Sequence, residues 1–402
     1  MSFLGARTSL LRARNNSHED GRVTFVELFF DLVFVFAITQ LSHGLLGDLT
    51  LAGLLHTALL LLAVWLLWIY TTWVANWLDP QRSPVRLMLF VLMLAGLLLS
   101  GAIPQAFAGA GLAFAAAYVF MHIGRCLFVL WALARHSPGN FRNFQRMTTW
   151  FAVSGVFWIA GGVADQELRL ALWLVALAIE LVAPWGGYFV PGLGRSTTAE
   201  WDIEGGHIAE RCGLFIIIAL GESILVTGAT FAGLAWNLPN SAAFVSAFAG
   251  AVAMWWIYFN IGAEKARHLI AHSADPGRLA RLAYTYMHIV IVAGIIVVAV
   301  GDELVLAHPS GHASTASTAA VLGGPALYLL GNILFKRSVA AWLPLSHLVG
   351  LAALLALVLG AAHLSPLLLG TAASAVLVIV AIWETLSLGP YRSVSSREGP
   401  VR

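Results

Sequence analysis

Apolar runs long enough to cross a lipid bilayer recur along nearly the whole chain. A bilayer core about 30 Å thick is spanned by about 20 apolar residues in a helix. Runs of this kind lie at 24–46, 52–77, 85–107, 110–134, 148–164, 168–190, 208–232, 241–263, 281–302, 316–335, 340–361 and 366–388. Only 10% of the residues are charged, against about 25% in soluble domains. We therefore predict an all-α integral membrane protein of about twelve transmembrane helices.

The Lys and Arg residues predict the orientation of these helices. Of the 22 basic residues, 19 lie in the two tails, in every second connection between runs or, for Arg86 and Arg281, at the very start of the run that follows such a connection. The opposite side holds only Arg169, while Arg125 and Arg211 fall inside runs. Because basic residues concentrate in short cytoplasmic loops, this alternation predicts that the N- and C-termini are both cytoplasmic.

The second half of the chain repeats features of the first half in the same order. The matched features are Trp68-Ile-Tyr70 with Trp256-Ile-Tyr258, Ala95-Gly96 with Ala293-Gly294, Gly124 to Phe128 with Gly331 to Phe335, and Glu180 with Glu384. An even number of helices per half gives both halves the same orientation, as in transporters built from parallel repeats. The predicted division is a cytoplasmic tail (1–23), a first six-helix half (24–190), a linker (191–206), a second half (207–388) and a tail (389–402).

The first run carries the densest set of polar residues. A charged group at the centre of a membrane helix costs about 2.5–3.5 kcal/mol, so such groups mark function. Glu27 and Asp31 are one turn apart on one helix face, and Gln40 and His43 lie together on another. Two neighbouring carboxylates in an apolar medium need a proton or a cation. Asp31 is thus a candidate proton or cation ligand, whereas Glu27 is equally well explained as an anion at the helix start.

The seventh run holds the companion charges. His207, Arg211 and Glu222 fall on one face of its helix, with Glu210 beside His207. Arg211 is the natural counter-charge, either for a carboxylate of the first run or for Glu210. A plain salt bridge would also explain Arg211 and Glu210, whereas Glu222 is the stronger candidate for proton or substrate binding.

Further candidates lie inside other runs, and several kinds of site are not indicated. The thinner candidates are His122, Arg125, Glu180 and His288. No metal-ligand spacing, nucleophile–base pattern or nucleotide-binding motif stands out. Cys126 and Cys212 sit in apolar segments, without the spacing of a disulfide or thiolate site. We therefore predict no catalytic residues, no metal, no cofactor and no nucleic-acid partner.

Two of these runs also resemble a known family. The stretch from Arg22 to Val35, with Gln40-Leu-Ser-His43 after it, and the stretch from His207 to Ser223 are similar to two signatures of the bacterial low temperature requirement protein A family. Two further stretches resemble it, from Thr72 to Asp79 and from Trp255 to Asn260, where Asn260 stands at a position often held by aspartate. The resemblance implies a multi-pass protein of the bacterial inner membrane. It supplies a phenotype, growth in the cold, rather than a reaction.

These observations favour a proton-coupled secondary transporter of a small solute or ion. An ion channel is the alternative, as is a membrane-embedded enzyme acting on a lipophilic substrate, although no catalytic spacing supports an enzyme. The expected partners are the lipid bilayer and a small solute, proton or other ion. Assembly into a homo-oligomer is left open.

Overall fold

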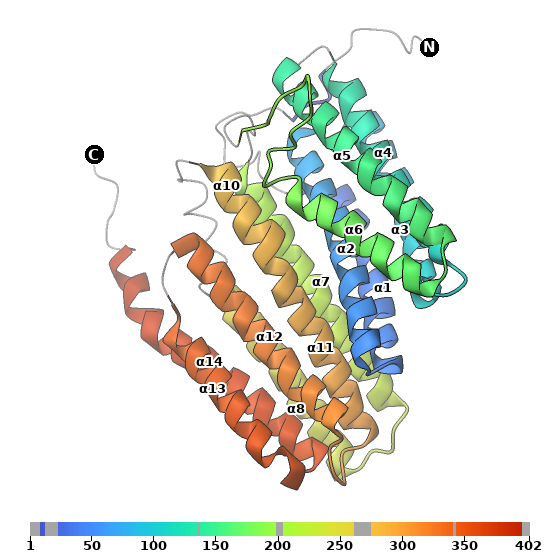
Figure 1. Cartoon of the computed structure of the whole chain (residues 1–402). Coiled ribbons are helices and arrows are strands. Elements are labelled where there is room, and N and C mark those ends of the chain that lie inside the picture. The colour runs from blue at the N-terminus through green and yellow to red at the C-terminus, as the bar shows by residue number, and fades with distance from the viewer. Residues whose placement is uncertain are drawn as a thin grey trace. The chain divides into compact units, whose positions relative to one another are not determined.

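The regular secondary structure of the protein is helical. The computed structural model describes residues 9–12, 23–134, 137–197, 204–260, 275–340 and 343–395. Within these ranges the β-structure is limited to two isolated bridges, Leu11 with Leu78 and Val190 with Gly194, and everything else regular is helix (Figure 1). The all-α prediction is confirmed for the described part of the chain.

Ten helical segments among the described residues are long and apolar enough to cross a bilayer. They are α1 (Phe25–Gly47), α2 (Leu51–Trp77), α3 (Ser83–Ala102) with η1 (Ile103–Gln105), α4 (Gly111–Leu133), α7 (Gly205–Ala232), α8 (Leu238–Phe259), α10 (Pro276–Ala280) with η3 (Arg281–Met287) and α11 (His288–Ala307), α12 (Thr315–Ala340), α13 (Leu345–Gly360) with η4 (Ala361–His363), and α14 (Pro366–Ser395). Each overlaps one of the predicted apolar runs.

The fifth and sixth predicted runs are helical as well, but they are not among these ten segments. α5 (Pro138–Val163) begins ten residues before the predicted run and opens with a polar turn. α6 (Gln166–Val182) has only 17 residues, fewer than the roughly 20 of a typical span. It ends earlier than predicted because Pro184 cannot continue a helix and Gly187 adopts a positive φ of 62°. The number of twelve crossings and the cytoplasmic termini therefore stay predictions.

The helices belong to two compact units. The first consists of Met1–Gly44, Leu51–Arg211 and Asp275–Arg278, and the second of Leu45–Thr50, Cys212–Ala274 and Leu279–Arg402. The division falls inside α7, whose first two turns belong to the first unit. The proposed repeat of two like-oriented halves stays a prediction.

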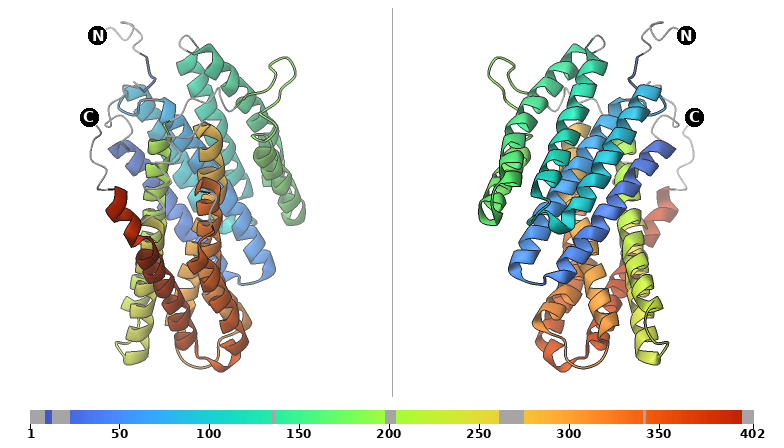
Figure 2. Two further views of the ribbon diagram at one scale, coloured as in Figure 1. Left: turned by 90° about the vertical axis from the view of Figure 1, so that its left-hand side faces the viewer. Right: turned by 90° about the vertical axis from the view of Figure 1, so that its right-hand side faces the viewer.

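Small residues let the helices approach closely within each unit. In the first unit, a Cβ at Gly162 of α5 would lie only 2.9 Å from the Cα of Leu112 in α4. In the second unit, α11 and α12 run side by side (Figure 2), and a Cβ at Gly294 would lie 2.5 Å from the backbone nitrogen of Tyr328. Such backbone-to-backbone packing is a recurring way in which membrane helices associate.

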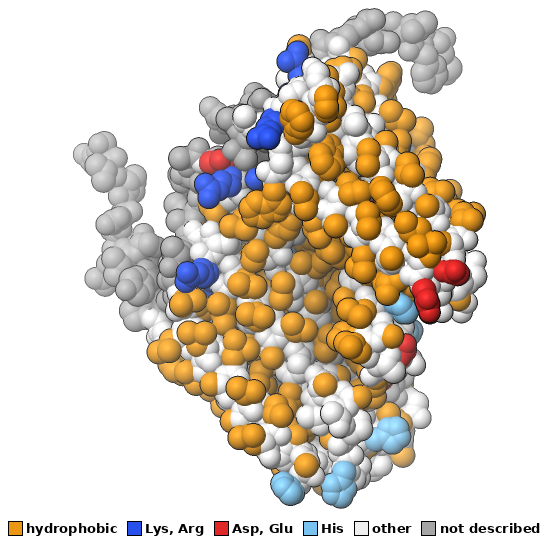
Figure 3. All heavy atoms as spheres, viewed as in Figure 1, with side chains coloured by type: hydrophobic (Ala, Val, Ile, Leu, Met, Phe, Trp, Pro, Cys, Tyr) orange, Lys and Arg blue, Asp and Glu red, His pale blue; other side chains and the backbone are white. Residues whose placement is uncertain are grey.

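The surface of α1 shows how the chain divides polar and apolar residues. Phe25, Phe29, Leu32 and Phe36 are exposed along one stripe of α1, whereas its acidic residues are completely buried. Hydrophobic side chains are also spread across the molecular face shown in Figure 3, and its charged side chains lie toward the edges. This is the arrangement expected in lipid, where charged groups turn toward protein and apolar groups turn outward.

Candidate functional site

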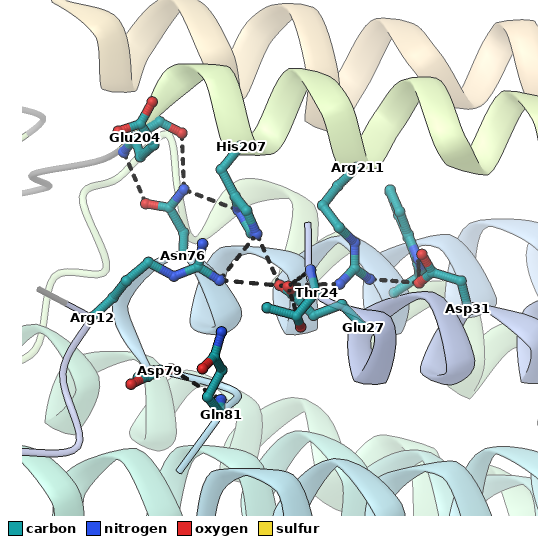
Figure 4. Close-up of polar contacts among 11 residues, drawn as sticks. Arg12, Thr24, Glu27, Asp31, Asn76, Asp79, Gln81, Glu204, His207 and Arg211 are labelled. Atoms are coloured by element: carbon teal, nitrogen blue, oxygen red, sulfur yellow. Dashed lines mark hydrogen bonds and ion pairs between the residues drawn. The ribbon is translucent and has the colours of Figure 1, made fainter. Parts of the chain in front are cut away.

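In the first unit, α1, α2 and the first two turns of α7 each bring a stripe of polar residues to the same place (Figure 4). We call this group the α1–α2–α7 cluster. Its members are Glu27 and Asp31 of α1, Trp68, Thr72 and Asn76 of α2, and His207 and Arg211 of α7. On every helix the members are four residues apart, which places them on one face. Each is at most 1% exposed, so the cluster is sealed from its surroundings.

The deeper layer of the cluster is built on Asp31. Its Oδ1 accepts hydrogen bonds from Arg211 Nη2 at 2.5 Å and from Trp68 Nε1 at 2.8 Å. The Arg211 guanidinium also lies over the Trp68 ring, 5.7 Å from its centre, in a cation–π contact. The other carboxylate oxygen, Oδ2, is buried and has no hydrogen-bond partner among the described residues, and the same holds for Arg211 Nε.

The outer layer is built on Glu27, and both of its oxygens are occupied. Oε1 lies 2.8 Å from His207 Nε2 and 3.4 Å from Arg211 Nη1. Oε2 accepts from the backbone nitrogen and the hydroxyl of Thr24, both at 2.8 Å, and lies 3.5 Å from Arg12 Nη2. Thr24 directly precedes α1, so Glu27 caps the start of its own helix, as an acid at the third helical position commonly does.

Arg12 reaches the cluster from the segment before α1. Its backbone nitrogen donates to Trp77 O at 2.8 Å, and Asp79 N donates to Leu10 O at 2.9 Å. These bonds hold residues 10–12 along the end of α2, and the Arg12 side chain is 12% exposed. Together with Arg12, the cluster therefore combines two carboxylates with two guanidinium groups and one imidazole. With the imidazole neutral, its net charge is zero.

A second buried group of charges lies between α2, α4, α5 and α6 of the same unit. We call it the Glu180 cluster. Glu180 of α6 accepts from Tyr118 Oη at 2.5 Å, from Ser154 Oγ at 2.8 Å and from Trp158 Nε1 at 2.9 Å. His122 Nε2 lies 4.0 Å from its carboxylate and has no hydrogen-bond partner among the described residues. The charge of Glu180 is thus surrounded by neutral donors.

The arginine of the Glu180 cluster also binds neutral groups. Arg125 Nη1 donates to Thr71 Oγ1 at 2.8 Å and to Leu67 O at 3.2 Å, and Nη2 lies 2.8 Å from His122 Nδ1. Since a guanidinium only donates, His122 Nδ1 is the acceptor, and the imidazole proton sits on Nε2, the nitrogen facing Glu180.

Comparison with known proteins agrees with the motifs that build these clusters. The bacterial low temperature requirement A protein (LtrA) family matches the chain over residues 22–382. The chain belongs to this family. It is also 41% identical over 381 residues to an uncharacterised protein of Rhizobium meliloti (strain 1021), covering 93% of this chain and 92% of that protein. No solved structure matches the chain. Family membership and the apolar helices together make it a multi-pass membrane protein embedded in lipid.

The structure gathers some of the predicted site residues of this LtrA family member and separates others. Arg211 pairs with the carboxylates of α1 rather than with Glu210, which lies outside the contacts of the cluster. Gln40 is partly exposed and His43 is exposed on α1, and neither joins those contacts. Glu222 is buried in the second unit.

His288 forms a separate site in the second unit. Its Nδ1 donates to Ala283 O at 2.9 Å, so its Nε2 accepts from Tyr258 Oη at 2.7 Å. Both ring nitrogens therefore form hydrogen bonds, and the ring links the π-helical turn η3, through Ala283, to α8, through Tyr258. No group of three or more His, Cys, Asp and Glu that could hold a metal ion occurs among the residues that the structure describes.

The sequence patterns missed several residues of these sites. Arg12 is one of the basic residues of the N-terminal tail, Trp68 belongs to the matched repeat features and Asn76 to a stretch that resembles the family, but none of the three is a predicted site residue. Lys336 counts among the basic residues of the connection after the predicted run 316–335, but α12 extends beyond that run and includes it. It lies inside α12, 4% exposed, and forms a buried ion pair with Glu384 of α14 beside His347. The position of Lys336 directly after an apolar run is the one sequence signal that could have indicated a buried acidic partner such as Glu384.

Proposed function

We propose that this protein is a proton-coupled secondary transporter of a small solute or ion in the bacterial inner membrane, with Asp31 as its proton-binding group. The observation that carries the proposal is the bonding of Asp31. A carboxylate buried in a membrane-spanning helix has one oxygen held by Arg211 and Trp68 and a second oxygen without a partner among the described residues. Ionisable residues inside membrane-spanning segments pair with one another and mark ion pathways and proton relays.

The two acids of α1 differ in a way that favours Asp31. A proton on Glu27 would displace one of the donors that already occupy both of its oxygens. A proton on Asp31 Oδ2 displaces nothing, and Oδ1 keeps its bond to Trp68. Glu27 therefore serves as an anchor of the helix start, and Asp31 carries the exchangeable proton.

The arginine supplies a route for coupling the proton to a solute. With Asp31 ionised, Arg211 bonds to it, and Glu27 lies within 3.4 Å on the other side. Protonation of Asp31 removes one of the two negative charges that hold the guanidinium and leaves the cluster with a net positive charge. Arg211 then binds a new partner or shifts toward Glu27, which biases the helices toward a second conformation.

The test uses the full chain reconstituted in liposomes that enclose a pH-sensitive dye. Alkali-metal chlorides and amino acids are added outside one at a time, and both solute uptake and luminal pH are recorded. We expect a transported solute to change the luminal pH, and Asp31→Asn to reduce this change at least tenfold. Asp48→Asn is the matched control, because Asp48 is exposed after the end of α1 and its carboxylate accepts from the backbone nitrogen and the hydroxyl of the neighbouring Thr50.

Two outcomes of the same experiment contradict proton coupling. Solute uptake that leaves the luminal pH unchanged and is equal in Asp31→Asn would remove Asp31 from the mechanism. An ion current that follows the membrane potential and ignores the pH gradient would indicate a channel instead.

A further inference from the structure

We propose that Asn76 is a positioning residue that holds His207 in one neutral tautomer, with the proton on Nε2 and the bond directed at Glu27. This inference rests on the proposed function only in that His207 belongs to the same proton-binding cluster. It concerns a residue in the last turn of α2 that lies in a stretch resembling the family but is not among the site residues expected from the sequence.

The amide of Asn76 has only one orientation that fits its surroundings. Its Oδ1 accepts from Glu204 N at 2.9 Å, and its Nδ2 donates to Glu204 O at 2.9 Å. A rotation of the amide by half a turn would place its NH₂ against a backbone N–H and its oxygen against a backbone carbonyl. The amide oxygen and nitrogen, which are usually hard to tell apart, are thus fixed by the backbone of a single residue.

The fixed amide determines where the imidazole carries its proton. Asn76 Nδ2, a donor, faces His207 Nδ1 at 3.3 Å, so Nδ1 has to accept. The proton of the neutral ring is then on Nε2, which lies 2.8 Å from Glu27 Oε1. A carboxylate oxygen accepts the proton of Nε2, so the contacts of both ring nitrogens indicate the same tautomer. A second proton on Nδ1 would meet the NH₂ group of Asn76.

The contact of Arg12 does not change this assignment. Arg12 Nη2 lies 3.4 Å from His207 Nε2, which would suit an acceptor at Nε2. That tautomer would place a proton on Nδ1 against Asn76 and would leave Glu27 Oε1 facing a bare nitrogen at 2.8 Å. The contact with Arg12 is the longest of the three, and a proton on Nε2 satisfies both the contact with Asn76 and the contact with Glu27.

The consequence for the cluster is a division of tasks between its two layers. His207 fixed as a donor keeps Glu27 Oε1 occupied, so the outer layer has no place for an extra proton. Asp31 in the deeper layer is then the acid that takes up a proton when the pH falls. Asn76 acts through His207 and Glu27, without touching Asp31 in any hydrogen bond that the structure shows.

The test measures the tautomer directly and needs no solute. The full chain is labelled with ¹⁵N at its 13 histidines, reconstituted in bilayers and examined by solid-state NMR, with His207→Gln assigning the signals by difference. We expect a protonated Nε2 and an unprotonated Nδ1 for His207 at neutral pH. A protonated Nδ1, alone or in an imidazolium ring, would overturn the proposal in the wild-type protein itself.

A substitution tests whether Asn76 causes this state. In Asn76→Asp, a carboxylate oxygen faces Nδ1, and we expect the signal of the unprotonated Nδ1 to be replaced by that of an imidazolium. Asn143→Asp is the matched control, since Asn143 is equally buried but bonds to Arg146, and it should leave the His207 signals unchanged. An unaltered His207 in folded Asn76→Asp would contradict the role. Because neither spectrum depends on flux, failure of the transport proposal leaves this result standing.

Discussion

The α1–α2–α7 cluster and the Glu180 cluster lie in the same unit and each combines carboxylate, guanidinium and imidazole groups, yet they compensate their charges differently. In the first, Asp31 bonds directly to Arg211, and Glu27 lies between Arg211 and Arg12. In the second, Glu180 receives three neutral donors, and Arg125 donates to neutral acceptors. α2 contacts both clusters, with Trp68 under Arg211 and Tyr70 under Arg125.

This difference determines how each cluster responds to the loss of one member. A direct ion pair leaves a buried, uncompensated charge when one partner is removed, which costs more than the pair contributed. A charge held by several neutral donors loses only one bond at a time. Removal of one charged member should therefore destabilise the first cluster more than removal of one donor destabilises the second.

The largest effect is expected for Arg211→Gln. The substitution leaves Asp31 and Glu27 buried with too little positive charge, and we expect a loss of about 3–5 kcal/mol in the free energy of unfolding. Thermal unfolding of the detergent-purified chain measures it. Arg195→Gln, at an exposed arginine, should stay within about 0.5 kcal/mol of wild type. Equal stability of the two variants would show that the ion pair is dispensable.

Glu180→Gln sharpens the comparison at the second cluster. The amide oxygen can still accept from Ser154 and Trp158, so we expect a smaller loss of about 1–3 kcal/mol. The same unfolding measurement applies. A loss as large as that of Arg211→Gln would mean that Glu180 and Arg125 depend on each other as an ion pair, and the contrast between the clusters would fail.

Tyr118→Phe removes a single neutral donor from Glu180. The hydroxyl bond to the carboxylate is 2.5 Å long, and a hydrogen bond to a charged group contributes about 1.5–3 kcal/mol. Because Ser154 and Trp158 remain, we expect a loss near the lower end of that range. A null result in thermal unfolding would indicate that Tyr118 only packs against its neighbours.

The smallest effect is expected at the start of α1. Thr24→Ala removes the hydroxyl bond to Glu27 but keeps the backbone bond, so the loss should be about 1 kcal/mol. Thr24→Ser keeps the hydroxyl and should restore most of it. If both variants lose the same stability, the methyl group of Thr24 matters rather than its bond to Glu27.

The sequence predicted the parts of this protein that follow from helix periodicity. The positions of the spanning helices came from apolar runs, and the pairing of Arg211 with an acid of α1 was one of two alternatives that the charges allowed. Both rest on spacing along a single helix and on the cost of burying a charge in lipid.

Other parts depend on which helices meet, and spacing along one helix does not contain that information. Asn76 acquires its role from the backbone of Glu204, 128 residues later. Arg12 reaches Glu27 only because residues 10–12 lie along the end of α2. Pro184 is a sequence signal for the early end of α6, but the run stays apolar beyond it, and the predicted helix therefore extends too far.

In the proposed mechanism Asp31, and not Glu27, takes up the proton. Infrared difference spectra of the reconstituted chain, recorded between alkaline and acidic buffer, detect the carbonyl band of a newly protonated carboxylic acid. We predict that wild type shows such a band, that Asp31→Asn lacks it and that Glu27→Gln retains it. A band that persists in Asp31→Asn and disappears in Glu27→Gln would contradict the account.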